Sequence, residues 1–461
     1  MTALLSSYGG EMDFTGKKVT IIGAGKSGIA AAALLNDTGA EIVLYDDKKI
    51  DTDSLKEKLP SDFRGKIECE KMSDELKNNT DILILSPGVP KDLPFIIEMQ
   101  ERGVKVIGEV ELAYYYTKGR IVAVTGTNGK TTTTALTGEI LKKKYSNTLV
   151  GGNIGIPYTE ICLKSSDDGL TVAEMSSFQL DTTETFHPAV SMILNITPDH
   201  LDRHHTMENY INAKLNCTVN QTSDDLCILN YEDEILREKA KTIPAKICWF
   251  SSKRVLDDGM YYRDGIIYEA VSGVSTPIVN VDEMILIGRH NYENVMAAVA
   301  AGRFLGVSVE SIRETLREFK PVEHRIEYVT TINDVKYYND SKGTNPDASI
   351  QAVRAMQGPT ILIGGGYDKG SEYDEWIEAF DGKIKMLLLM GQTGEKIAEC
   401  AKKHGFTSFM FVESMEEAVT YCKKTAVPGD TVLLSPCCAS WGMFKNYEER
   451  GRIFKELVRQ Q

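Results

Sequence analysis

Residues 121–134 read IVAVTGTNGKTTTT, an apolar run followed by a glycine turn and a Lys-Thr pair. The apolar run is typical of a buried strand, and the residues after the turn are expected to open a helix. A strand, a glycine turn and a helix N-terminus in this order direct backbone N–H groups at phosphate oxygens. Lys130 would neutralise the terminal phosphates of a nucleotide, and the Thr131 hydroxyl would bind Mg²⁺. The segment therefore predicts a nucleotide site formed by Gly126, Thr127, Asn128, Gly129, Lys130, Thr131 and Thr132.

This segment departs at one position from the phosphate-binding pattern G-x-x-x-x-G-K-[ST]. Val124 occupies the place of the first glycine. A plain glycine turn between a strand and a helix is the simpler interpretation, but it leaves the Lys-Thr pair unexplained. Nucleotide binding is therefore the preferred hypothesis for this segment.

The composition limits the class of protein before any other motif is considered. A chain of 461 residues is too long for a single hydrophobic core, and its length predicts roughly three domains. The 52 basic and 66 acidic side chains give a net charge of −14, which disfavours general nucleic-acid binding. Nine cysteines without a C-x-x-C spacing indicate reduced thiols in a cytoplasmic protein. We expect neither a signal peptide nor a membrane span, because the apolar runs are only strand-length.

Short apolar runs alternate with helical patterns along most of the chain, which predicts an α/β architecture with mainly parallel sheets. Three blocks can be separated, at 1–108, 109–321 and 322–461. Residues 257–282 are expected to form short strands and turns. The expected strands lie at 19–22, 42–45, 82–85, 104–107, 171–173 and 190–194, and within YYNDS, TILIGGG, KMLLLMG, FMFVES and TVLLSP of the third block.

A second glycine turn lies in VTIIGAGKSGIA, residues 19–30, which fits G-x-G-x-x-G. A dinucleotide site usually carries an acidic residue about 20 positions further on for the ribose, and Asp46 or Asp47 could serve. The motif alone is weak evidence, and the segment at 121–134 already supplies a nucleotide site. A nicotinamide cofactor and a turn that only packs a helix on a sheet both remain open.

Acidic and histidine-rich segments follow later strands of the second block. Glu174 comes directly after the strand expected at 171–173, where a carboxylate is well placed to hold Mg²⁺ near nucleotide phosphates. A further loop, at 194–205, follows the strand expected at 190–194. Zinc is disfavoured for this loop because the loop offers no cysteine ligand, and Mg²⁺ is favoured. Lys214 lies in a helical run and is, from its pattern alone, a surface lysine. The loop at 194–205 indicates a metal or phosphate neighbourhood through Asp199, His200, Asp202, His204 and His205.

Polar segments of the third block also follow expected strands or lie at a linker, among them DSKGTNP at 340–346 and GGGYDKG at 364–370. Each of them is compatible with an ordinary turn. In a doubly wound sheet, however, the carboxyl ends of the strands form the ligand crevice. Together the segments place Lys342, Thr344, Lys369 and Ser440 near one edge, where they could bind an anionic substrate.

The same segments, in this order, resemble the ATP-dependent Mur ligases, which add amino acids to a UDP-linked peptidoglycan precursor. TGTNGKTT is shared with the related folylpolyglutamate synthases and indicates only the superfamily. EMSSFQL, ILNITPDHLDRH, GRHNYENV, NDSKGTNPD and LSPCCASWGMF are similar to the D-glutamate-adding branch, and the resemblance covers essentially the whole chain. Small departures at Met175, Gly343 and Cys437 remove no functional group.

The resemblance implies a fold and a reaction. The fold would comprise a Rossmann-like UDP-substrate domain at 1–108, a central P-loop ATP-binding domain at 109–321 and a Rossmann-like amino-acid domain at 322–461. ATP would phosphorylate the terminal carboxylate of UDP-N-acetylmuramoyl-L-alanine, and the D-glutamate amine would attack the acyl-phosphate. The protein would be a cytoplasmic monomer without a nucleic-acid partner or membrane insertion.

The resemblance also implies the site residues at matching positions. Lys130, His200 and Lys214 would be catalytic. Two Mg²⁺ ions would be held by Thr131, Glu174, His200 and Lys214, the last as a carbamylated lysine. The ATP site would extend to Asn291, Asn294, Arg325 and Asp340. The D-glutamate contacts would be Lys342, Thr344, Lys369, Ser440 and Tyr447, and the UDP-substrate contacts would be Lys26, Ser27, Gly28, Asp46, Ser86, Gly88, Asn153, Ser176 and Gln179.

Under this hypothesis the turn at 19–30 holds the UDP diphosphate, so an isolated first domain should bind the UDP substrate and not NADH. Another amide ligase of the same fold, such as a folylpolyglutamate synthase, is the main alternative, although it would normally lack a UDP-type first domain. A non-catalytic nucleotide-binding regulator is disfavoured because the Mg²⁺ and substrate motifs are intact. A nicotinamide-dependent oxidoreductase is the least favoured alternative.

Overall fold

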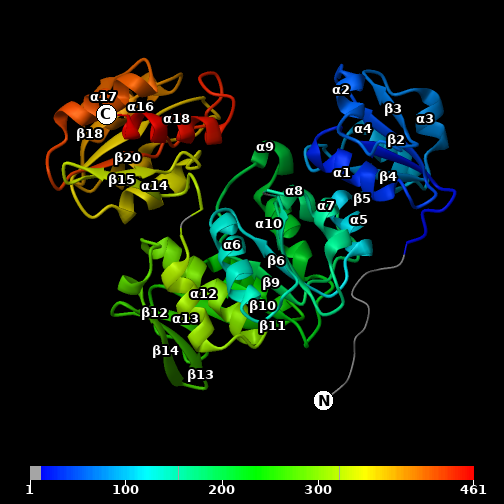
Figure 1. Cartoon of the computed structure of the whole chain (residues 1–461), viewed down its shortest axis with the longest axis horizontal. Coiled ribbons are helices and arrows are strands. Elements are labelled where there is room, and N and C mark those ends of the chain that lie inside the picture. Colours follow the sequence, from blue (N-terminus) through cyan, green and yellow to red (C-terminus); the bar gives the residue numbers. More distant parts are fainter. Residues whose placement is uncertain (1–11, 154, 321, 461) are drawn as a thin grey trace. The chain divides into compact units, whose positions relative to one another are not determined.

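The computed structural model describes residues 12–153, 155–320 and 322–460. The boundary predicted at residue 321 lies outside the described residues. The division into three domains at 1–108, 109–321 and 322–461 stays a prediction. The chain divides into two compact units, one formed by residues up to Asn280 with Glu293–Leu316, the other by Val281–Tyr292 with residues from Arg317 onward. Figure 1 shows helices beside each of three sheets. Within the described ranges, every helix is too short or too polar to cross a bilayer.

The first sheet has five parallel strands in the order β3-β2-β1-β4-β5. β4 reads ILIL and is buried at all four positions, as expected for a parallel strand with both faces covered. The strand order reverses between β1 and β4, and ligands bind at such switch points. The strands are β1 (Lys18–Ile22), β2 (Glu41–Asp46), β3 (Lys66–Cys69), β4 (Ile82–Leu85) and β5 (Lys105–Gly108), and the helices are α1 (Lys26–Leu35), α2 (Thr52–Lys56), α3 (Asp74–Asn79), α4 (Pro94–Glu101) and α5 (Glu109–Tyr116).

The second sheet has nine strands in the order β14-β13-β12-β11-β10-β9-β6-β8-β7. It is parallel from β7 to β12, and β12, β13 and β14 form an antiparallel meander within the stretch predicted as short strands and turns. The strands are β6 (Arg120–Thr125), β7 (Thr148–Gly152), β8 (Leu170–Glu174), β9 (Val190–Ile193), β10 (Leu226–Asn230), β11 (Lys246–Ser251), β12 (Gly259–Arg263), β13 (Ile266–Val271) and β14 (Val274–Asn280).

Helices follow these strands; α6 to α11 lie between strands of the parallel part, and α12 and α13 come after β14. They are α6 (Lys130–Lys142), α7 (Tyr158–Ile161), α8 (Ser177–Leu180), α9 (Leu201–His204), α10 (Met207–Leu215), α11 (Glu234–Lys239), α12 (Arg289–Phe304) and α13 (Val309–Glu318). Short 3₁₀ turns lie at η1 (Cys162–Lys164), η2 (Asn216–Thr218), η3 (Ala240–Thr242) and η4 (Val281–Glu283).

The third sheet has six strands in the order β15-β16-β20-β17-β18-β19, with only the β15–β16 pair antiparallel. The strands are β15 (Glu327–Ile332), β16 (Val335–Asn339), β17 (Thr360–Gly364), β18 (Ile384–Leu389), β19 (Phe409–Phe411) and β20 (Thr431–Leu434). The helices are α14 (Pro346–Ala355), α15 (Asp374–Glu378), α16 (Gly394–Lys403), α17 (Met415–Thr425) and α18 (Tyr447–Arg459).

The α/β class and the predicted strands are confirmed, but five strands were missed, namely β3, β7, β10, β11 and β15. β10 and β11 carry apolar residues that could have indicated them. The other three are harder to detect. β3 and β15 are only partly buried, and β7 ends in two glycines. Such strands lack the continuous apolar run or the strict alternation that makes a strand visible in a sequence. Their positions follow from pairing with neighbouring strands.

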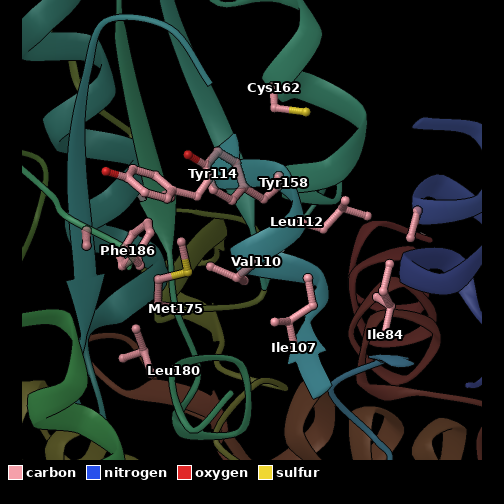
Figure 2. Close-up of a cluster of buried hydrophobic side chains, with 14 of the residues drawn as sticks. Ile84, Ile107, Val110, Leu112, Tyr114, Tyr158, Cys162, Met175, Leu180 and Phe186 are labelled. Carbon is pink, nitrogen blue, oxygen red and sulfur yellow. The ribbon is translucent and has the colours of Figure 1, made fainter. Parts of the chain in front are cut away.

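A large apolar core includes residues of the first and the second sheet, and α5 contributes to it directly. Val110 and Tyr114 of this helix are almost fully buried. The Tyr114 ring meets Phe186 edge-to-face, with 5.6 Å between the ring centroids. Figure 2 shows these side chains together with Ile84 of β4 and Met175, which follows β8. The two sheets that carry the glycine turns therefore share one core.

Candidate active site

The predicted phosphate-binding loop lies between β6 and α6, as expected. Gly126 and Gly129 have φ values of +147° and +89°, which glycine adopts without steric strain. A Cβ atom on Gly129 would lie 2.3 Å from Oδ1 of Asn294. Asn195, after β9, accepts from the Asn128 N–H at 2.8 Å and donates to its carbonyl at 3.1 Å. The loop is therefore held in place by its neighbours, with α6 beginning at Lys130.

Two lysines meet at this loop. The Nζ of Lys130 donates to the carbonyl oxygens of Gly126 and Thr127, both at 2.8 Å. The Nζ of Lys214, from α10, donates to the same Gly126 oxygen at 2.9 Å. Lys214 is only 1% exposed, so it is not the surface lysine that its pattern indicated. Burial, and next the positive charge of Lys130, hold the pKa of Lys214 well below its usual range.

Glu174 ends β8, beside β6 in the sheet, where it is aligned with Val124. Its Oε1 accepts a hydrogen bond from Nδ2 of Asn153 at 2.8 Å. Its Oε2 is buried without a hydrogen-bond partner among the described residues. A buried carboxylate oxygen without a donor is costly unless a cation binds it. With the buried Thr131 hydroxyl at the start of α6, this oxygen fits the hard-oxygen chemistry that Mg²⁺ requires.

The histidine-rich loop after β9 is less clustered than its sequence suggested. His200 is exposed and lies edge-on to Phe178, with 4.9 Å between the ring centroids. His204 is buried, and its Nε2 lies 2.9 Å from Oγ of Ser177. His205 turns to Asp92, 2.7 Å from its Nε2. Within residues 12–153, 155–320 and 322–460, this loop supplies no group of three metal-ligating side chains close enough to share an ion.

Ser176 and Gln179 form a capping box at the start of α8. The Gln179 Oε1 accepts from the Ser176 N–H at 2.9 Å, and its Nε2 donates to Oε1 of Glu109 at 2.9 Å. Gln179 is therefore committed to internal partners. Glu109 was not identified from the sequence, although an acidic residue next to an apolar run was a visible signal. Burial raises the pKa of Glu109, with the hydrogen bond from Gln179 acting in the opposite direction.

The first glycine turn lies at the switch point of the first sheet. Oδ2 of Asp46, at the end of β2, accepts from the Ala24 N–H at 2.8 Å. Ser86, after β4, donates from Oγ to the Gly23 carbonyl at 3.1 Å. Asp46 and Ser86 thus hold the turn, while Lys26 and Gly88 are exposed. The turn presents the N-terminus of α1, which is suited to an anion.

Gly28→Ala is expected to destabilise the protein by about 1–3 kcal/mol, the range for overpacking. A Cβ at this position would lie 1.8 Å from the Gly23 carbonyl oxygen, so the backbone of the turn must shift. Gly25→Ala is the matched control, because its Cβ would meet nothing within 4 Å. Thermal unfolding of both variants tests this, and equal unfolding temperatures would contradict it.

The third sheet places Asp340 in a buried network after β16. Its Oδ2 accepts from Oγ of Ser435 at 2.8 Å, and its Oδ1 accepts from the Ile326 N–H at 3.2 Å. Burial raises the pKa of Asp340 to about 6, and the charge of Arg325 opposes this shift. The Arg325 Nε is buried without a hydrogen-bond partner among the described residues, which suits an anionic ligand.

Asp340→Asn is expected to change the dependence of stability on pH. The folded pKa, about 6, lies above the ordinary value of 3.8, so the stability that protonation contributes is present at low pH and lost as the pH rises through 6. The difference corresponds to about 3 kcal/mol at neutral pH. The variant should unfold at a higher temperature than the native protein at pH 7.5 and at a similar temperature at pH 4. The control Asp381→Asn, at an exposed position, should leave the dependence of the unfolding temperature on pH unchanged. If the unfolding temperature of Asp340→Asn followed the pH in parallel with that of the native protein, the raised pKa of Asp340 would be contradicted.

The residues predicted to bind the amino acid lie after β16, β17 and β20. Lys342 Nζ lies 5.6 Å from the centre of the Tyr447 ring, and Lys369 Nζ lies 5.1 Å from the Trp441 ring. Thr344 is half-buried and Ser440 is buried. They share one edge of the sheet because parallel strands end together. The lysines are thus held against aromatic rings at that edge.

Arg450 is a further polar residue of this region that sequence reasoning missed. It is 1% exposed and donates to the Ser341 Oγ at 3.0 Å, the Ser341 carbonyl at 2.7 Å and the Cys438 carbonyl at 3.1 Å. Burial lowers its pKa to about 10. Arg450 ties α18 to the segments after β16 and β20, and only its position in a helical run was visible beforehand.

The two asparagines predicted on the adenine side belong to different compact units. Asn291 is buried and donates from Nδ2 to the Ile287 carbonyl at 2.7 Å. Asn294 accepts from Oγ1 of Thr133, in α6, at 3.2 Å. Asn294 therefore lies beside the phosphate-binding loop.

Comparison with known families matches three successive parts of the chain. The family described as Mur ligase MurD-like, N-terminal domain, matches residues 17–108. Mur ligase middle domain matches residues 124–302, and Mur ligase, glutamate ligase domain, matches residues 324–438.

Two relatives match nearly the full length. A protein of Lachnoclostridium phytofermentans named UDP-N-acetylmuramoylalanine--D-glutamate ligase is 57% identical over 448 residues, which cover 97% of this chain and 99% of that protein. A protein of Lachnospira eligens with the same name is 53% identical over 449 residues, with the same coverage of 97% and 99%.

Solved structures show the same fold at low identity. UDP-N-acetylmuramate-alanine ligase MurC from Thermotoga maritima has a TM-score of 0.59 and 20% identity, covering 95% of this chain and 98% of that chain. MurF from Acinetobacter baumannii has a TM-score of 0.61 and 17% identity, covering 96% and 93%. With these folds and the long, highly identical relatives, the chain belongs to the Mur ligase family, alongside the UDP-N-acetylmuramoylalanine--D-glutamate ligases.

Proposed function

We propose that this chain is an ATP-dependent ligase that joins D-glutamate to UDP-N-acetylmuramoyl-L-alanine in peptidoglycan precursor synthesis. The observation that carries the proposal is 57% identity, over 97% of the chain, to a protein named for this reaction. ATP transfers its γ-phosphoryl group to the alanine carboxylate, which gives an acyl-phosphate and ADP. The D-glutamate amine attacks the acyl carbon, and the tetrahedral intermediate collapses to the amide with release of phosphate and one proton.

The loop between β6 and α6 would bind the ATP phosphates. Backbone N–H groups from Gly129 to Thr132 would face the anion at the N-terminus of α6, because those of Thr127 and Asn128 donate to Asn195. Lys130 would move its Nζ from the carbonyls of Gly126 and Thr127 to the γ-phosphate. Charge neutralisation at this position stabilises the transferring phosphoryl group.

Thr131 and Glu174 would hold the first Mg²⁺, which supplies positive charge at the phosphates when bound. The unpartnered Oε2 of Glu174 supports this assignment. Asn153 supports the same carboxylate through its Oε1 and would also contact the muramoyl-alanine part of the substrate.

Lys214 would act as a carbamate in a second Mg²⁺ site, with His200. The buried amine has a lowered pKa, so more of it is neutral and able to attack CO₂. The neutral amine forms an N–C bond to CO₂ and releases one proton; counted from the ammonium, two protons leave, and a cation becomes an anionic oxygen ligand. The change also removes the repulsion between Lys214 and Lys130 at the Gly126 carbonyl.

The turn at Gly23–Gly28 would bind the UDP diphosphate through the N-terminus of α1. Because Asp46 and Ser86 hold the turn, we assign the direct diphosphate contacts to the backbone of Ser27 and Gly28 and to the Lys26 ammonium. Asp46 would border the uridine, and Gly88 would close the pocket from the loop after β4. Ser176 and Gln179 would shape the muramoyl-alanine site.

The edge of the third sheet would bind D-glutamate. Lys369 and Lys342 offer charges to its carboxylates, and the Thr344 and Ser440 hydroxyls offer hydrogen bonds. Tyr447 would pack beside Lys342. Arg325 and Asp340 would contribute to binding of the ATP phosphate and ribose, and Asn291 and Asn294 to the adenine side.

A phosphate-release assay tests the function. Turnover should require ATP, the UDP substrate and D-glutamate together, with L-glutamate, lysine and diaminopimelate inactive. The full chain should also fail to enhance NADH fluorescence. Turnover with diaminopimelate or a pteroyl substrate would overturn the proposal. We place the reaction in the cytoplasm, and the nine free cysteines support a reducing compartment.

A further inference from the structure

Two helices of the C-terminal region bring together side chains that the proposed reaction does not use. Asp374 and Glu378 lie four residues apart on α15, and Cys400 and His404 lie four residues apart at the end of α16. Residues four apart lie on the same face of a helix. The ligand atoms of Asp374, Cys400 and His404 lie within 4.8 Å of one another.

The distances in this cluster are close to those of a metal site. Nε2 of His404 lies 2.8 Å from Oδ1 of Asp374, and Nδ1 lies 3.5 Å from Oε1 of Glu378. In a tetrahedral zinc complex with usual bond lengths, adjacent ligand atoms are about 3.3–3.6 Å apart. The 2.8 Å between the two proposed ligand atoms, Nε2 of His404 and Oδ1 of Asp374, is about 0.5 Å shorter than this, so a small side-chain rotation is sufficient to admit an ion.

We propose that Asp374, Cys400 and His404 form a zinc site that joins α15 to α16, with Glu378 bound to the second imidazole nitrogen. A thiolate, an imidazole and a carboxylate are all zinc ligands, and Mg²⁺ prefers oxygen alone. A carboxylate on the free ring nitrogen of a ligating histidine fixes the ring orientation. Binding converts the Cys400 S–H to a thiolate–zinc bond and releases one proton to solvent, and water takes the fourth position.

The surroundings of the cluster support a site that is open to solvent. Cys400 packs at the rim of an apolar core and is half-buried. The Asp374 side chain is 40% exposed and that of His404 is 20% exposed. Nζ of Lys403 lies 2.5 Å from Oδ1 of Asp374, so an ammonium now neutralises the carboxylate that zinc would bind. Lys403 is long and 71% exposed, which allows it to leave.

A second cluster in the same region does not have this character. Glu323, His324 and Glu327 also lie close together. The Lys455 ammonium pairs with both carboxylates there, and the His324 Nδ1 lies 2.9 Å from Nδ2 of Asn339. Those groups already have internal partners, and Lys455 is too buried to withdraw easily.

Cobalt and zinc titration of the metal-free full chain tests the site. Co²⁺ should produce a thiolate-to-cobalt charge-transfer band at one ion per chain, which Zn²⁺ removes and Mg²⁺ does not. Cys400→Ser should abolish the band, and Cys69→Ser, at another half-buried free cysteine, should retain it. His404→Gln should also abolish it, which guards against misfolding of the cysteine variant.

Two variants separate a metal site from a surface ion pair. Glu378→Gln should weaken zinc binding about tenfold, as is usual when the partner of a ligating histidine is lost. Lys403→Met should tighten binding, because it removes the competing ammonium. The absence of a band in the native protein, or its persistence in Cys400→Ser, would overturn the proposal. Zinc binding is independent of ligase activity, so these results stand apart from the phosphate-release assay.

Discussion

Lys130→Ala is expected to lower kcat by about 10²–10³-fold, the usual effect of removing one donor that stabilises transition-state charge. Lys130 begins α6, where its ammonium already lies against the loop carbonyls of Gly126 and Thr127. The transferring phosphoryl group would then lack the Lys130 ammonium, and its charge would be met by backbone N–H groups, Mg²⁺ and Arg325. Phosphate release under saturating substrates measures the change.

Lys142→Ala is the matched control because this lysine lies on the same helix. Its side chain is about half exposed and its Nζ pairs with Glu139 at 2.6 Å. An exposed pair of this kind contributes little to stability, so kcat should stay within about twofold of the native value. Thermal unfolding of Lys130→Ala checks that the loop still folds. A folded Lys130→Ala variant with near-native kcat would exclude the phosphate role.

The two glycine turns were predictable because their function depends on local backbone geometry. Each combines an apolar strand, glycines and a helix start within a short segment, and β1 with α1 and β6 with α6 follow this order. Gly129 must adopt a positive φ beside Asn294, a requirement that only glycine meets well. Glu174 was predictable for a related reason, since the end of a parallel strand beside β6 must face the same crevice.

Other site features could not be read from local pattern. Lys214 looks like any helical lysine, and its burial results from packing of α10 against the phosphate-binding loop. His200 and His204 both lie against Phe178, whereas His205 turns away to Asp92. Positive φ values at His200 and His205 turn the backbone at both ends of α9. Contacts between distant segments decide these positions, and the spacing of the loop residues does not reveal them.

Lys214→Ala is expected to abolish most turnover, by about 10²-fold or more, if the carbamate supplies a ligand to the second Mg²⁺. The substitution leaves a space beside the Gly126 carbonyl that a small carboxylate can enter. Acetate or formate should therefore restore part of the activity to Lys214→Ala and none to Lys130→Ala. Removal of dissolved CO₂ should lower the activity of the native protein and leave the acetate-rescued variant unchanged.

The fold should tolerate the loss of Lys214. The folded pKa of Lys214 lies well below the ordinary value of 10.5, so the unfolded chain binds more protons between these two pKa values and the buried amine opposes folding at neutral pH. Lys214→Ala should therefore unfold near or above the native temperature, apart from the cost of the space it leaves. Asn212→Ala, at an exposed position of the same helix, should keep both activity and stability. Full activity of Lys214→Ala without added carboxylate would exclude the carbamate. If the variant instead loses activity, acetate restores it, and removal of CO₂ causes the same loss in the native protein, Lys214 is identified as the anionic ligand.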